Sequence, residues 1–167
     1  MDELQRILQS GTLAEIRGLF EFDSSTDPKE IVKKYKIWGR YFYPKFYKSK
    51  DAPFHAEMDI KRARLYLGLD TEFLNIAFRD SGKTTRAKIF RAFVIANDKS
   101  HYRRYLRVLS KDLGNAKQSV TDVYNMLVAS RVKALYPEIF EKTDSKREET
   151  MASFTTATGI KMIADTV

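Results

Sequence analysis

The sequence contains no cysteine, and its only two histidines lie far apart at His55 and His101. Without cysteine there is neither a disulfide framework nor a thiolate metal site, and two separated imidazoles make no metal cluster. No apolar run approaches the roughly 18 to 20 uninterrupted residues that a membrane-spanning helix needs. We therefore expect no structural zinc and no membrane partner.

The N-terminal residues MDELQR also lack the basic-then-apolar layout of a secretory signal peptide. A cytoplasmic location is the resulting expectation. The 167 residues are 43% hydrophobic and 13% aromatic, which is enough apolar material for one ordinary domain with a real core.

The net charge of +8 is unevenly distributed along the chain. Residues 27–64 carry 11 Lys or Arg against 5 acids, and residues 79–117 carry 11 against 3. Both blocks are interleaved with tyrosine, which is typical of a surface that contacts phosphate groups. Basic helices are also commonly solvated faces, so charge alone leaves both interpretations open.

The first part of the chain is predicted to be helical. Residues 1–22 have apolar positions at helical spacing, interrupted where Thr12 and Glu15 form a capping-box pattern. Thr26 or Asp27 ahead of Pro28 is a helix-start signal for residues 30–42. The apolar stripe of this helix predicts a packed face, with a base-stacking platform as the alternative: Ile31, Tyr35, Trp38 and Phe42. Another helix is expected from Phe54 to Leu67, ended by Gly68.

The second part alternates predicted strands and helices. Strands are expected at 72–78 and 104–110, helices at 83–97 and 116–135, a turn at 112–115, and a hairpin formed by 152–157 and 160–164 around Thr158–Gly159. A strand, a helix and another strand within about 40 residues favour a parallel sheet. We therefore predict an α/β fold, with a helical segment over 1–68 and a partial parallel sheet flanked by helices over 69–167.

The segment from Phe73 to Thr85 joins the predicted strand 72–78 to the predicted helix 83–97 through a short polar turn with Gly82, Lys83 and Thr84. Phosphate-binding loops are built this way, because backbone N–H groups at a helix start point at the phosphates. The general pattern has a glycine where this chain has Ala77, and a Gly-Lys-Thr triplet also occurs by chance. The strand before the triplet and the helix after it favour the loop.

The loop sequence AFRDSGKTT, residues 77–85, resembles the variant Walker A loop of viral terminase large subunits, the ATP-driven motors that package DNA into procapsids. In that loop an extra basic residue precedes Gly-Lys-Ser/Thr. Residues 52–58, 108–118 and 153–164 are similar in order and spacing to further family segments. The resemblance covers roughly residues 30–167, and it implies the first half of a P-loop ATPase core.

Carried over to this sequence, the resemblance implies that Lys83 contacts the β and γ phosphates of ATP and that Thr84 ligates Mg²⁺. Arg79 would be an additional cation beside the phosphates, and its alternative is an ordinary surface arginine. His55 would lie near the adenine, and its alternative is a partly buried histidine at a helix start. The backbone cradle would comprise Ser81, Gly82 and Thr85.

The resemblance also indicates what the chain does not contain. Family members continue with an apolar strand ending in Asp-Glu, which supplies the magnesium and water-activating carboxylates, and then with a nuclease domain. Residues 94–98 are apolar then acidic, but they fall at the end of the predicted helix 83–97. We therefore expect an N-terminal portion without catalytic residues, from a parent that hydrolyses ATP to translocate double-stranded DNA.

The family's partners are a portal and a small terminase subunit, and its motors work as rings, whereas the oligomeric state of this chain stays open. Two alternatives to a terminase remain. One is a basic DNA-binding or assembly module without catalysis, in which Lys83 is one cation among many. The other is part of a different P-loop ATPase, such as a helicase.

Overall fold

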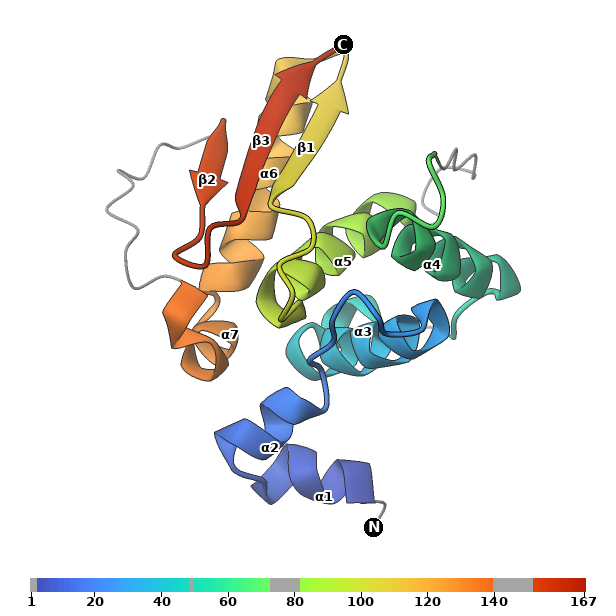
Figure 1. Cartoon of the computed structure of the whole chain (residues 1–167), viewed down its shortest axis with the longest axis vertical. Helices are drawn as coiled ribbons and strands as arrows, with labels where there is room; N and C mark the ends of the chain where they lie inside the picture. Colours follow the sequence, from blue (N-terminus) through green and yellow to red (C-terminus); the bar gives the residue numbers. More distant parts are fainter. Residues whose placement is uncertain (1–2, 49, 73–81, 140–151) are drawn as a thin grey trace. The chain divides into compact units, whose positions relative to one another are not determined.

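The fold is mixed α/β in the computed structural model, which describes residues 3–48, 50–72, 82–139 and 152–167. A helical N-terminal region is followed by a small three-stranded sheet packed against helices (Figure 1). The chain divides into two compact units, Met1–Asn75 with Asn97–Ser100, and Ile76–Ala96 with His101–Val167. Within the part of the chain that is described, no helix is both long and apolar enough to cross a membrane.

The first unit begins with two short helices, α1 (Glu3–Ser10) and α2 (Leu13–Gly18). Thr12 caps α2: its Oγ1 accepts a hydrogen bond from the Glu15 N–H at 3.3 Å, while Glu15 Oε2 accepts one from the Thr12 N–H at 2.8 Å. These reciprocal bonds satisfy two N–H groups that a helix start leaves without intrahelical partners. The predicted capping box and helical pair are confirmed.

The aromatic stripe lies on α3 (Pro28–Phe42), whose start is capped by Asp27 through Oδ1, which accepts from the Lys29 N–H at 2.8 Å. All four stripe residues are buried, so the packed face is confirmed: Ile31, Tyr35, Trp38 and Phe42. A short 3₁₀ turn, η1 (Pro44–Phe46), follows.

The helix α4 (Pro53–Tyr66) has Leu67 as its C-cap and is followed by Gly68, which has a φ of +72°. Glycine reaches this left-handed conformation without the steric cost that a Cβ adds, so the predicted stop is confirmed. Residues 97–100 then return to the first unit: Phe22 N–H donates to the Asn97 carbonyl at 3.1 Å, and Lys99 N–H donates to the Phe22 carbonyl at 2.9 Å.

Asp98 in this returning segment is buried, and its Oδ2 accepts a hydrogen bond from the Tyr66 hydroxyl at 2.6 Å. Its Oδ1 accepts from the backbone N–H and the hydroxyl of Ser100, at 2.9 and 2.6 Å. The acidic residue that follows Val94–Asn97 therefore closes a turn and ties it to α4.

The second unit contains a sheet with the strand order β1-β3-β2. Strand β1 (Tyr105–Ser110) pairs in parallel with β3 (Lys161–Thr166), and β2 (Ser153–Thr155) pairs with β3 in antiparallel fashion. Helix α6 (Leu113–Val128) packs against all three strands. Buried side chains from both layers form the core: Val108, Val120, Val123, Leu127, Phe154, Met162 and Ala164.

The positions of β1 and β3 and the hairpin β2–β3 agree with the predicted strands, whereas the parallel pairing of β1 with β3 was not predicted. Gly159 in the hairpin turn has a φ of +87°, and its N–H donates to the Thr156 carbonyl at 3.0 Å. The predicted parallel partner of 104–110 was the strand 72–78, of which 73–78 lies outside the described residues. Because β3 pairs in parallel with β1 and in antiparallel fashion with β2, the sheet that the structure describes is mixed.

Two local predictions were wrong. The helix expected over 116–135 is broken at Ala129, whose ψ of 134° separates α6 from α7 (Ser130–Leu135). The break places Val132 and Leu135 in buried positions, so packing overrides the helix propensity of alanine. The turn expected at 112–115 is instead the start of α6, with Asp112 Oδ1 accepting from the Gly114 N–H at 2.6 Å.

Candidate functional site

The polar turn with Gly82, Lys83 and Thr84 ends at the start of helix α5 (Lys83–Asn97). Gly82 has a φ of +75°, and its carbonyl accepts the hydrogen bond of the Arg86 N–H at 2.9 Å. It therefore occupies the N-cap position, where the chain turns into the helix. Glycine is favoured here because an L side chain rarely adopts this φ.

The three residues after Gly82 are the first helical positions of α5. Their N–H groups have no acceptor within an α-helix, and the helix dipole adds partial positive charge at this end. Thr84 is exposed, while Lys83 and Thr85 are half-buried. The end of α5 thus carries amides, one ammonium group and a hydroxyl that favour an anion.

The space beside the turn is open among the described atoms. A Cβ built on Gly82 would have no described atom within 4 Å. The donor set and this open approach fit a phosphate group with a hydrated Mg²⁺, for which Thr84 would supply the protein hydroxyl. Arg79 and Ser81, the other loop residues predicted to contribute, lie outside the described residues.

An ion pair connects α5 to α6 in the second unit. Lys88 Nζ donates to Asp122 Oδ2, and Gln118 Nε2 donates to Asp122 Oδ1 at 2.8 Å. Because α6 packs on the sheet, this pair links the helix that begins at Lys83 to the strands. Lys88 and Asp122 are 34 positions apart, so no local pattern in the sequence indicates the pair.

Arg86 is a further residue that sequence reasoning did not single out. It lies one turn into α5 and is 7% exposed, unlike a typical solvated arginine. In the sequence it is one of many cations between 79 and 117. Burial is what distinguishes it, and burial follows from packing.

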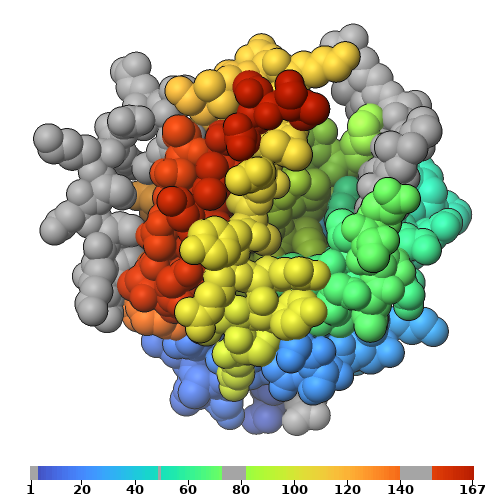
Figure 2. Space-filling model, turned by 45° about the horizontal axis from the view of Figure 1, so that its top comes forward, coloured from blue at the N-terminus to red at the C-terminus, as the bar shows by residue number. Residues whose placement is uncertain are grey.

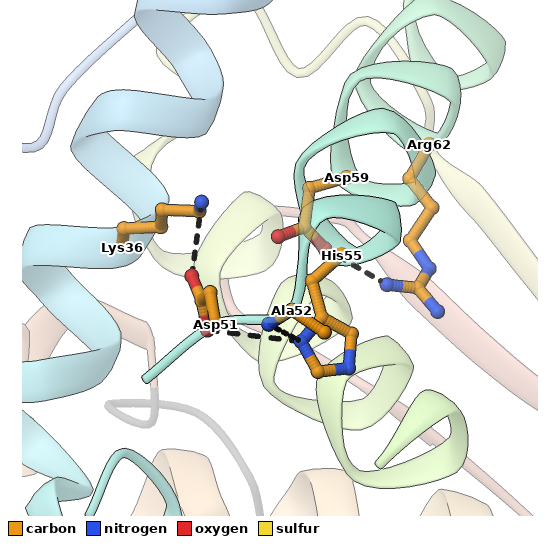
Figure 3. A network of polar contacts seen from close by, with 6 residues as sticks. All are labelled: Lys36, Asp51, Ala52, His55, Asp59 and Arg62. Carbon is orange, nitrogen blue, oxygen red and sulfur yellow. Dashed lines mark hydrogen bonds and ion pairs between the residues drawn. The ribbon is translucent and has the colours of Figure 1, made fainter. Parts of the chain in front are cut away.

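His55 belongs to the first unit, where it lies at the start of α4 (Figure 3). Its Nδ1 accepts a hydrogen bond from the Ala52 N–H at 3.1 Å and lies 3.9 Å from Asp51 Oδ1. An accepting Nδ1 requires the neutral imidazole with its proton on Nε2. His55 therefore caps the first turn of α4, as expected of a helix-start histidine.

Two charge pairs lie near this cap. Lys36 Nζ lies 3.0 Å from Asp51 Oδ2, which fixes the segment before α4 to α3. Asp59 is fully buried, and its Oδ1 accepts from Arg62 Nη1 at 3.0 Å. Each charged or imidazole side chain in Figure 3 has a structural partner, and the set forms no cluster of metal ligands.

Searches against protein-family models, curated proteins and solved structures found no match.

The predicted site residues are thus distributed over the two units. Gly82, Lys83, Thr84 and Thr85 are brought together at one helix end in the second unit, and His55 lies in the first. Among the residues that are described, no group of three or more histidine and carboxylate side chains could hold a metal ion. Any magnesium at Thr84 would therefore depend on phosphate oxygens and water for its remaining ligands.

Proposed function

We propose that this chain is the ATP-binding N-terminal portion of a viral DNA-packaging terminase large subunit. The parent protein would hydrolyse ATP to move double-stranded DNA into a procapsid, with a portal and a small terminase subunit as partners. The observation that carries the proposal is the left-handed Gly82 directly before a helix that begins Lys83-Thr84. A P-loop needs these residue types at this place.

The second unit supports the same proposal. Strand β1 is followed by helix α6 and then, after α7, a 3₁₀ turn and β2, by strand β3, which is the parallel neighbour of β1. A strand, helix and parallel strand is the repeating unit of sheets that bind nucleotides at the carboxyl ends of their strands. The finer proposal is that 69–167 form the first half of a P-loop ATPase sheet.

In this proposal the chain's own groups bind and orient the triphosphate. The N–H groups of Lys83, Thr84 and Thr85 would donate to phosphate oxygens, and the Lys83 ammonium would neutralise charge on the β and γ phosphates. The Thr84 hydroxyl would hold Mg²⁺, which supplies charge neutralisation during phosphoryl transfer when it is bound. Arg79 and Ser81 complete the proposed loop, and no catalytic residue is assigned.

The test is the melting temperature with and without Mg-ATP or a non-hydrolysable analogue. A ligand at about ten times its Kd stabilises the folded state by about 1.4 kcal/mol, which corresponds to about 3 to 6 °C for a chain of this size. Lys83→Ala should abolish the shift. The matched control is Lys133→Ala, an exposed lysine on α7, which should keep it.

Magnesium dependence gives a second readout. Thr84→Ala should reduce the part of the shift that Mg²⁺ adds to ATP, while leaving the shift with ATP and a chelator unchanged. If millimolar nucleotide gives no shift, or if Lys83→Ala and Lys133→Ala behave alike, the nucleotide site does not exist in this chain.

The alternative is a basic nucleic-acid-binding or assembly module without catalysis. The observation that favours it is the exposure of the cations Arg103, Arg104 and Arg107 in the second unit. In that case Lys83 is one cation among many, and its removal should weaken polyanion binding only slightly. If the chain is part of another kind of P-loop ATPase, such as a helicase, nucleotide should shift the melting temperature in the same way. That alternative differs from a terminase in its translocation activity.

A further inference from the structure

The segment 101–111 combines four cations with two tyrosines and contains no acidic residue. The proposed nucleotide site uses none of it. Tyr102 and Tyr105 are 46% and 73% exposed, although a large aromatic side chain gains most by burial. The cations alone would be enough to keep this surface solvated. The two exposed rings therefore call for an explanation of their own.

The pleat of β1 explains which side chains are presented. Successive side chains point to opposite faces of a strand, so Val108 lies buried on the face that α6 covers. The opposite face carries Tyr105, Arg107 and Leu109, all of which are exposed. In Figure 2 the yellow segment around β1 and the red β3 run side by side across the face turned to the viewer.

The neighbouring strand adds one more cation to this face. In the register of the parallel pair, Tyr105 lies opposite Lys161 and Arg107 lies opposite Ile163. Asp165 Oδ2 lies 3.7 Å from Arg107 Nη1, and the two side chains are 45% and 63% exposed. An ion pair this exposed is weak, so the guanidinium can exchange it for a phosphate.

Arg103 and Tyr102 lie just before β1 in the chain and are also exposed. The Arg103 guanidinium carbon lies 4.9 Å from the centroid of the Tyr102 ring, which is a cation–π contact at an exposed site. Such a pair presents a flat aromatic ring with a positive charge beside it to a ligand. We call this surface the β1 face and define it as Tyr105, Arg107 and Lys161 on the sheet together with Tyr102 and Arg103 in the segment that leads into β1.

We infer that the β1 face binds single-stranded DNA. The cations match the phosphates in charge, and Tyr105 and Tyr102 offer ring faces on which bases stack. A duplex conceals the faces of its bases within the helix, so the tyrosines favour an unpaired strand over double-stranded DNA. This proposed site uses none of the residues of the proposed nucleotide site and does not require nucleotide.

The experiment is fluorescence anisotropy with a labelled oligothymidylate of about 20 nucleotides at low salt. Tyr105→Ala should weaken binding about tenfold, because stacking on an aromatic side chain contributes of that order per base. Tyr105→Phe keeps the ring and should bind within about twofold of the wild type. Arg107→Gln should reduce the salt slope of log K by about 0.7.

Phe46→Ala is the matched control variant. Phe46 is also an exposed aromatic residue beside a cation, since it is 44% exposed and Lys45 Nζ lies 4.9 Å from its ring centroid, but it belongs to the first unit. Its removal should leave oligonucleotide binding unchanged. A circular dichroism melt of each variant checks the fold, and the high exposure of Tyr105 predicts that Tyr105→Ala keeps it.

Four results would overturn the inference. The first two are unchanged binding for Tyr105→Ala and equally weakened binding for Phe46→Ala. The third is a duplex of the same length that binds as tightly as the single strand. The fourth is an RNA strand that binds more than about tenfold tighter, because stacking and phosphate contacts ignore the 2′-hydroxyl and therefore predict similar affinities for RNA and DNA. Lys83→Ala should bind the oligonucleotide like the wild type, and Tyr105→Ala should keep any Mg-ATP shift. The two proposals can therefore fail independently.

Discussion

At the residue scale, the described carboxylates with lowered pKa values each have a local partner. Asp70 is held by Arg64, whose Nε and Nη2 donate to its oxygens at distances from 2.8 to 3.1 Å. Glu15 and Asp23 are held by hydrogen bonds from Thr12 and Ser25, which also lower their pKa values. These acids stabilise turns and helix starts, so their lowered pKa values have local structural causes.

The Asp70 pair gives a prediction about pH. Hydrogen bonds from Arg64, followed by the charges of Arg64 and Lys61, hold the pKa of Asp70 below its usual value of 3.8. A lowered pKa in the folded state means that the pair's contribution is present above the unfolded pKa and is lost as the pH falls through the folded pKa.

We therefore expect the wild type to exceed Asp70→Asn in free energy of unfolding by a constant amount near neutral pH. That difference should shrink below about pH 4. Urea unfolding of both proteins from about pH 7 to about pH 3 measures it. A difference that grows on acidification would contradict the assigned pair.

At the scale of elements, turn glycines determine where strands and helices meet. Gly159 has a φ of +87°, and a Cβ built on it would meet no described atom, so only the backbone conformation opposes a side chain. Gly159→Ala should lower the free energy of unfolding by about 1 to 2 kcal/mol, because an L residue is strained in this region. Denaturant unfolding followed by circular dichroism measures the change.

Gly18→Ala is the control for this prediction. Gly18 lies in α2, has no described atom near its built Cβ and does not have a positive φ. Alanine at such a site should be neutral or stabilising by up to about 1 kcal/mol. Equal losses at Gly159 and Gly18 would show that the left-handed turn is not the cause.

The elements that sequence reasoning predicted are those with local causes. Thr12 with Glu15, Asp27 before Pro28, and Gly68 and Gly159 act within a few residues, so their patterns are visible in the chain. The break at Ala129 depends on distant packing, and alanine gives no local signal for it. Gly82 and Lys83 at the start of α5 were predictable, whereas the burial of Arg86 and the Lys88–Asp122 pair needed three-dimensional structure.

At the scale of the whole molecule, the chain passes between two units more than once. The first unit regains the segment Asn97–Ser100 after the chain has formed most of α5. Sequence reasoning placed a single boundary at residue 68 and could not anticipate this return, because the contacts of Phe22 with Asn97 and Lys99 span more than 70 positions. Local patterns do not encode such pairing.

Trp38, the only tryptophan, makes the stability of the first unit observable by itself, since it is fully buried there. Tyr66→Phe removes the hydroxyl that donates to the buried Asp98 carboxylate. We expect this substitution to lower the free energy of unfolding measured by Trp38 fluorescence by about 1.5 to 3 kcal/mol, as for hydrogen bonds to charged groups.

Because each unit has its own core, we expect the effect of a substitution to stay within its unit. Tyr66→Phe should shift the unfolding midpoint that Trp38 fluorescence reports. Gly159→Ala should leave that midpoint unchanged and shift a separate unfolding transition seen by circular dichroism. Tyr105→Phe, which removes an exposed hydroxyl in the second unit, should change neither by more than about 0.5 kcal/mol. If Gly159→Ala shifts Trp38 fluorescence as far as it shifts circular dichroism, the two units unfold as one cooperative structure, since a strained turn in one core would then destabilise the other.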